Sequence, residues 1–252
     1  IVNSDWSSDV CSSDLFDIRN HFKLGPVKYH NVVASIKGTK YPDEYVIISG
    51  HLDSYDVATG GIDCGTGIGP MMEAARMIAL SGAKPKRTIL FVAFAGEEFG
   101  LLGAKSYVKT HAKELGKIAN LFNRDGGPTP PVGISVPQAM YDDFVEVCKP
   151  VKEIRADYPF EVKVAKPFKR PTQSGGTDAS VFAVEGVPTF GFNTQDIKGY
   201  NFSYGEIWHT ERDLYTKNIP EYQEHAATVT AVVALGIANL SKQLSREGMH
   251  KK

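Results

Sequence analysis

The feature that most constrains this chain is an apolar run at residues 88–94, followed closely by the adjacent carboxylates Glu97 and Glu98. A run without polar alternation is typical of a strand buried on both faces of a parallel sheet. In open α/β sheets ligands bind beyond the carboxyl ends of the strands, and two charges placed there repel unless a cation or a proton holds them. The pair therefore indicates a metal site, although an isolated Glu-Glu is also explained as a solvated helix start.

The composition fits one ordinary globular domain. The chain has 252 residues, of which 42% are hydrophobic and 23% charged, enough for one large α/β core. A net charge of -1 gives no basic field for a phosphate backbone, so we expect no nucleic-acid partner. No apolar stretch approaches the roughly 20 residues that a membrane span needs, and three cysteines are too few for a disulfide framework.

Predicted strands and helices alternate along the chain. Two β-branched runs, at residues 30–36 and 44–49, flank a turn-rich segment and predict a hairpin. Further strands are predicted at residues 88–94, 118–122, 160–164 and 187–192, and helices at residues 68–80, 101–114, 141–151, 178–184 and 222–244. This alternation predicts an α/β fold, a three-layer αβα sandwich with a mixed, largely parallel central sheet.

Residues 1–15 repeat Ser-Ser-Asp and show neither helical nor strand periodicity. We expect them to be a non-native or disordered leader and exclude them from the fold. Residues 16–252 then form one domain.

One acid or imidazole follows each of several predicted strands. His51 follows the strand that ends at Ser49, and Asp53 is placed to accept a hydrogen bond from its ring and so to support catalysis. His51 alone would be explained as a loop residue. Asp63 lies in a glycine cluster before a predicted helix, where a carboxylate could bridge two cations or cap the helix.

Asp125 follows another predicted strand, and His209 lies beside Trp208 in a loop. Each alone is explained as a turn or as packing. The combined set has two imidazoles and three carboxylates, a mixture that suits a pair of zinc-like ions: His51, Asp63, Glu98, Asp125 and His209. Glu97, which is next to a ligand, would take the proton from an activated water.

The chain carries five motifs in order: Gly-His-Leu-Asp-Ser at 50–54, Ile-Asp-Cys-Gly-Thr-Gly at 62–67, Ala-Gly-Glu-Glu-Phe-Gly at 95–100, Arg-Asp-Gly at 124–126 and Trp-His-Thr-Glu-Arg-Asp at 208–213. Together they resemble the co-catalytic zinc aminopeptidase family, most closely its plasma glutamate carboxypeptidase (carboxypeptidase Q) branch, over about residues 28–245. The resemblance implies one zinc held by His51, Asp63 and Asp125, another held by Asp63, Glu98 and His209, and Glu97 as the general base.

The resemblance also implies that residues 16–252 are a zinc peptidase catalytic domain without its N-terminal elements. A propeptide and a protease-associated domain would precede it in that branch. The branch implies an exported protein, secreted or periplasmic, and a possible homodimer. One departure is Cys64, where the family usually carries Asp or Asn, because a thiol at this position could capture a soft metal.

The stretch at residues 174–178 resembles the family's Gly-Thr-Asp segment. Backbone N–H groups at Gly176, Thr177 and Asp178 could receive a substrate carboxylate, or Thr177 and Asp178 could simply cap a helix. Tyr204 could form a wall of the pocket or pack as an ordinary aromatic residue.

The leading hypothesis is a di-zinc metallo-exopeptidase of the aminopeptidase, carboxypeptidase or dipeptidase type that hydrolyses small peptides. Two alternatives stay open. One is a single-zinc acyltransferase of the glutaminyl-cyclase type, and the other is a non-catalytic binding domain of the same fold.

Overall fold

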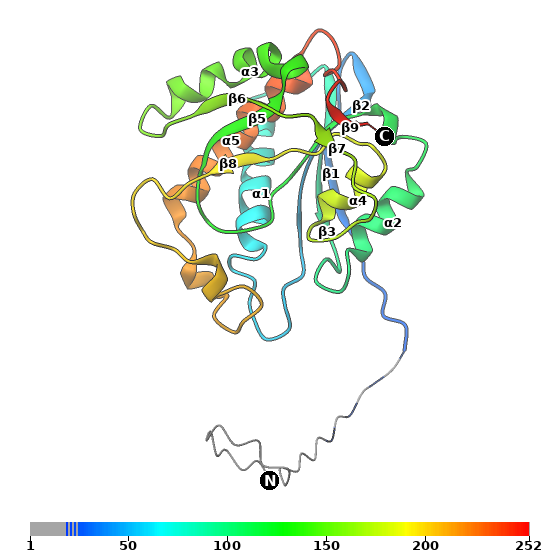
Figure 1. The fold of residues 1–252 in the computed structure, drawn as a ribbon, viewed down its shortest axis with the longest axis vertical. Helices are drawn as coiled ribbons and strands as arrows, with labels where there is room; N and C mark the ends of the chain where they lie inside the picture. The colour runs from blue at the N-terminus through cyan, green and yellow to red at the C-terminus, as the bar shows by residue number, and fades with distance from the viewer. Residues whose placement is uncertain (1–18, 20, 22, 24, 252) are drawn as a thin grey trace.

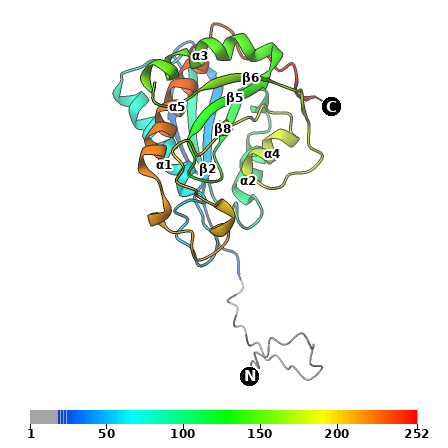
Figure 2. The same cartoon turned by 60° about the vertical axis from the view of Figure 1, so that its left-hand side comes forward.

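A computed structural model describes residues 19, 21, 23 and 25–251 of the chain. The leader expected at residues 1–15 lies outside the described residues. Figure 1 shows a central layer of strands with helices on both sides, and Figure 2 shows the same layers after a rotation. The predicted αβα architecture is confirmed.

The main sheet has the strand order β1-β3-β2-β4. Its members are β1 (Val32–Ile36), β2 (Tyr41–His51), β3 (Arg87–Phe94) and β4 (Ile118–Asn123). β2 runs parallel to both β3 and β4. The predicted hairpin between the first two strands is wrong, because β3 lies between them and β1 pairs antiparallel with β3, with Val33 opposite Val92.

A second sheet has the order β6-β5-β8, built from β5 (Pro131–Pro137), β6 (Glu161–Ala165) and β8 (Phe192–Thr194). The segment just before β8 contacts β4 of the first sheet, where the Leu121 N–H donates to the Pro188 oxygen at 2.9 Å and Leu121 forms an isolated bridge with Thr189. The strand predicted at 187–192 is therefore a single bridge followed by a short strand, and β5 was not predicted. A pair of short strands, β7 (Phe168–Lys169) and β9 (Met249–Lys251), lies parallel near the C-terminus.

The helices form the two outer layers (Figures 1 and 2). One side carries α1 (Gly65–Leu80), α3 (Tyr141–Ile154) and α5 (Pro220–Asn239), and the other carries α2 (Leu102–Thr110) and α4 (Asp178–Val184). α5 ends five residues before the predicted end, because Leu240 adopts an extended backbone with φ -53 and ψ 147.

The apolar runs of β2 and β3 are explained by this layering. In β2, Val46 and Ile48 face the core under α1 and α5, whereas Ile47 faces the core under α2 and α4. In β3, Phe91 faces the core under α1 and α5, and Val92 faces the core under α2 and α4. A strand covered on both faces needs apolar residues at every position, which is why no polar alternation is seen.

The topology brings three chain segments to one edge of the main sheet. His51 is the last residue of β2, Glu97 follows β3, and Asp125 follows β4. Because these strands are parallel, their carboxyl ends meet there. No helix among the described residues is both long and apolar enough to cross a bilayer.

Candidate metal centre

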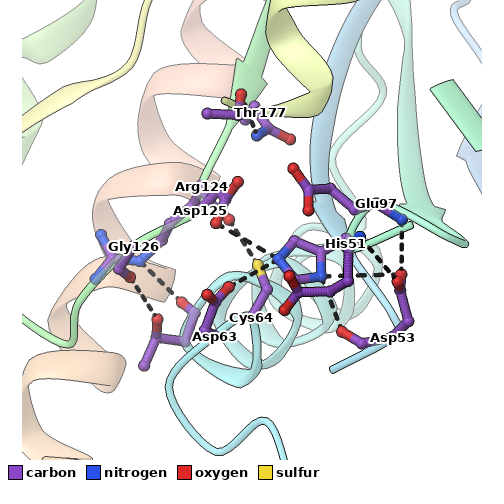
Figure 3. A network of polar contacts seen from close by, with 12 residues as sticks. His51, Asp53, Asp63, Cys64, Glu97, Arg124, Asp125, Gly126 and Thr177 are labelled. Atoms are coloured by element: carbon purple, nitrogen blue, oxygen red, sulfur yellow. Dashed lines mark hydrogen bonds and ion pairs between the residues drawn. The ribbon is translucent and has the colours of Figure 1, made fainter. Parts of the chain in front are cut away.

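His51 is the centre of a buried polar cluster at this edge. Its Nε2 atom lies 2.8 Å from Oδ1 of Asp63 and 3.4 Å from Oδ1 of Asp125. The residue is only 2% exposed. Burial alone would lower the pKa of the imidazole, but the carboxylates of Asp125 and Asp63 outweigh burial and raise that pKa. Figure 3 shows these side chains pointing toward one another.

His209 and Glu98 form the second part of the cluster. The Nε2 atom of His209 lies 3.0 Å from Oε2 of Glu98. The other oxygen of Glu98, Oε1, is buried and has no hydrogen-bond partner among the described residues. His51, Asp63 and Glu98 each offer a ligand atom, and these atoms lie within 4.8 Å of one another. The structure thus brings all five residues of the predicted ligand set together.

The ring of His209 is positioned by its backbone and by two aromatic neighbours, Tyr55 and Trp208. Its φ is 58°, in the left-handed region that non-glycine residues seldom adopt. The ring stacks on that of Tyr55, with centroids 4.3 Å apart and planes 5° apart. The Trp208 ring lies on His209 as well, with centroids 4.2 Å apart. The backbone and the two rings together direct the imidazole to Glu98.

Asp63 is held by two residues from the segment around His209. Oδ1 of Asp213 accepts a hydrogen bond from the Ile62 N–H at 2.7 Å, and Oδ2 accepts one from the Asp63 N–H at 3.1 Å. The Tyr204 hydroxyl donates to Oδ2 of Asp63 at 2.9 Å. Asp213 was not predicted as a site residue, although it is the last residue of the motif at 208–213.

Asp53 makes different contacts from those expected. Its main-chain oxygen, not its carboxylate, lies 2.8 Å from Nδ1 of His51, and Oδ1 is 3.9 Å from that nitrogen. The carboxylate instead accepts hydrogen bonds from the N–H groups of Glu97 and Glu98, each at 3.1 Å. Asp53 therefore connects the loop after β2 to the loop after β3.

Glu97 lies at a cavity of about 530 Å³ whose wall includes Asp63, Glu98 and Asp125. Burial raises the pKa of Glu97 to about 8. Four carboxylates around one cavity repel one another unless protons or cations compensate their charge. The arrangement therefore suits a bound cation.

Three of the four predicted substrate contacts line this cavity: Gly176, Thr177 and Tyr204. Asp178 does not, because it is fully buried at the start of α4 and its two carboxylate oxygens have no partner among the described residues. Burial raises its pKa to about 7. The Thr177 hydroxyl oxygen accepts a hydrogen bond from the Ala179 N–H at 3.1 Å, so Thr177 is the helix cap.

The layered sheet and the cluster at the carboxyl ends of its parallel strands define an α/β exopeptidase fold. The chain belongs to peptidase family M28, whose family model matches residues 31–233. The resemblance identified from the five motifs is confirmed.

Individual relatives agree with this assignment. The chain is 32% identical over 231 residues to carboxypeptidase Q of Rattus norvegicus, covering 90% of the chain and 46% of the relative. It matches the crystal structure of a peptidase M28 precursor from Shewanella amazonensis SB2B with a TM-score of 0.71 and 34% identity, covering 85% of this chain and 46% of that one. The chain thus spans about half the length of these relatives.

A more distant structure shows the same fold. BSAP, a zinc aminopeptidase from Bacillus subtilis, matches with a TM-score of 0.63 and 21% identity, covering 88% of this chain and 53% of that one.

Proposed function

We propose that this chain is the catalytic part of a zinc-dependent exopeptidase that hydrolyses the peptide bonds of small peptides. The observation that carries the proposal is the convergence of two imidazoles and three carboxylates at one edge of the sheet, where His209 and the three carboxylates line the same cavity as Glu97. The names of two relatives, a carboxypeptidase and a zinc aminopeptidase, support it.

The donors fit two zinc ions. We assign one ion to His51, Asp63 and Asp125, and the other to Asp63, Glu98 and His209. Imidazole nitrogens and carboxylate oxygens are ordinary zinc ligands, and manganese or cobalt could use the same set. The unpartnered Oε1 of Glu98 gives the second position a buried acceptor that a cation would satisfy. Bound zinc would polarise the scissile carbonyl and make a water a better nucleophile near neutral pH.

Glu97 is the residue that moves the proton. It takes a proton from the attacking water and gives it to the leaving amine, a role that needs a carboxylate facing the cavity. Asp53 positions it by holding the Glu97 N–H. Gly176, Thr177 and Tyr204 would contact the peptide from the cavity wall.

The test is hydrolysis of dipeptides and amino-acid anilides by the zinc-loaded protein and by Glu97→Gln. Because loss of a general base typically costs about 10²–10⁴-fold, kcat should fall by that factor while the zinc content stays unchanged. Glu153→Gln, on the outer face of α3, is the matched control and should leave kcat unchanged. Unchanged turnover in Glu97→Gln would refute the proposed role.

Two features favour the peptidase over the alternatives. A single-zinc acyltransferase needs only one ligand group, whereas this chain keeps Asp125 beside His51 as well as Glu98 beside His209. A binding domain needs neither group. Zinc analysis separates the peptidase from the acyltransferase, since two equivalents of zinc per chain fit the peptidase and one fits the acyltransferase.

The family resemblance further supports an extracytoplasmic location and a homodimer, which we include in the proposal. Sedimentation of the purified chain and fractionation of its source cells test these two points. A monomer at all concentrations, or recovery from the cytoplasm alone, would contradict them.

A further inference from the structure

Cys64 lies inside the cluster and not merely beside it. Its Sγ atom, an imidazole nitrogen of His51 and a carboxylate oxygen of Asp125 lie within 4.8 Å of one another. Cys64 is 2% exposed, so its thiol lies in the buried part of the cluster. Figure 3 shows the sulfur between the His51 ring and Asp125.

The backbone around Cys64 leaves space for the sulfur and little else. A Cβ atom added at Gly67 would lie 2.5 Å from Sγ, and one added at Gly50 would lie 3.2 Å from it. Glycine at these two positions lets the first turn of α1 approach the end of β2 with the sulfur between them. The side chain therefore has a defined place in the site.

The Cys64 thiol is in contact with the main chain of Arg124. The Sγ atom donates to the Arg124 main-chain oxygen at 3.0 Å, and the Arg124 guanidinium interacts electrostatically with Cys64. The guanidinium donates only to main-chain oxygens, such as that of Thr66 at 2.8 Å, and makes no ion pair with a carboxylate among the described residues. Arg124 therefore holds the sulfur through its main chain, while its guanidinium holds the main chain of neighbouring segments.

We propose that the sulfur of Cys64, together with His51 and Asp125, is a ligand of one of the two ions and makes that position selective for thiophilic metals. The inference rests on the proposed function only in that the cluster binds metal. When the ion binds, the S–H bond breaks, the proton leaves to solvent and a sulfur lone pair forms the bond to the metal. Thiolate ligands favour zinc and cadmium, whereas all-oxygen sets suit manganese and magnesium.

A second consequence is that the two ions differ in how firmly they are held. The position formed by His51, Cys64 and Asp125 is the more deeply buried of the two. Its His51 side chain is 1% exposed, whereas the His209 side chain of the other position is 35% exposed. We therefore expect a chelator to remove the second ion first.

Cobalt substitution tests the proposal directly. Cobalt is bound to the metal-free chain, and the sulfur-to-cobalt charge-transfer band in the near ultraviolet is recorded at measured cobalt content. All variants carry Cys11→Ser, since Cys11 lies outside the described residues. The band should be present in this background and in Cys148→Ala, a control at the other described cysteine, which is buried in α3. It should be absent in Cys64→Ser and Cys64→Asp, while both still bind cobalt.

The ratio of cadmium to manganese affinity gives a second readout. We expect it to fall by about tenfold or more in Cys64→Asp, because oxygen replaces sulfur. A cobalt-loaded chain without the band, or a band that survives Cys64→Ser, overturns the role of the sulfur and leaves the peptidase proposal intact. A chain that binds no cobalt at all overturns both.

Discussion

The Tyr204 hydroxyl donates a 2.9 Å hydrogen bond to Oδ2 of Asp63, joining residues 141 positions apart. The other oxygen of the same carboxylate, Oδ1, lies 2.8 Å from Nε2 of His51. The phenol therefore fixes the rotation of the carboxylate that we assign to both ions. Groups that orient metal ligands in this way usually matter for metal affinity.

Removal of this hydroxyl should weaken metal binding. In Tyr204→Phe we expect zinc affinity to fall by about 10–100-fold, because the Asp63 carboxylate is no longer oriented. Competition with a chromophoric chelator measures the zinc affinity of each variant. Tyr215→Phe is the control, since Tyr215 is 78% exposed and should give wild-type affinity. Wild-type affinity in Tyr204→Phe would show that the hydrogen bond does not act through the metal.

The two hydrogen bonds from the Ile62 and Asp63 N–H groups to Asp213 should matter for folding. Asp213→Ala leaves both buried donors without a partner, so we expect the free energy of unfolding of the metal-free chain to fall by about 2–4 kcal/mol. Urea denaturation measures this. Asp157→Ala removes an exposed ion pair with Arg155 and should cost less than about 1 kcal/mol. Equal losses of unfolding free energy in Asp213→Ala and Asp157→Ala would contradict a stabilising role for the two buried hydrogen bonds to Asp213.

His225 should make stability depend on pH. The residue is fully buried in α5 and stacks on Tyr158 at 3.9 Å, and burial lowers its pKa from 6.5 to about 4. The unfolded chain therefore binds this proton more readily, so the contribution is present above pH 6.5 and is lost as the pH falls toward 4. At 1.36 kcal/mol per pKa unit, the loss is at most about 3 kcal/mol.

The measurement compares urea denaturation of the wild type and His225→Gln across this pH range. The difference in unfolding free energy between the two isolates His225 from other titrating groups, such as Asp178. We expect the wild type to lose stability relative to the variant as the pH falls. A difference that stays constant from pH 7.5 to 4 would contradict a lowered pKa.

The sequence allowed prediction of those elements whose signal is local. β2 and β3 are covered on both faces, so continuous apolar runs mark them, and α1 follows a clear helical spacing. β5 was missed because Pro131, Gly133 and Pro137 all disfavour a strand. Gly133 is nevertheless required there, since a Cβ atom would lie 2.3 Å from the Glu161 main-chain oxygen.

Pairings between distant segments could not be read in the same way. The hairpin prediction failed because β1 pairs with β3, more than 50 residues later in the chain. No pattern in the residues near β1 indicates this pairing. The five residues that we assign as ligands could be proposed from the sequence because each follows a predicted strand or lies in one of the five motifs. Asp213 acts on Asp63 through main-chain N–H groups 150 positions away, a relationship that only the folded chain reveals.

The central claim is that His51, Asp63, Glu98, Asp125 and His209 together hold two metal ions. The most direct measurement is the zinc content per chain, by mass spectrometry, of the folded protein after zinc loading and exhaustive dialysis, for the wild type and for Glu98→Ala and Asp125→Ala. We predict two equivalents in the wild type and a loss of at least one in each variant. A wild-type chain that keeps no zinc, or variants that keep both equivalents, would contradict the account.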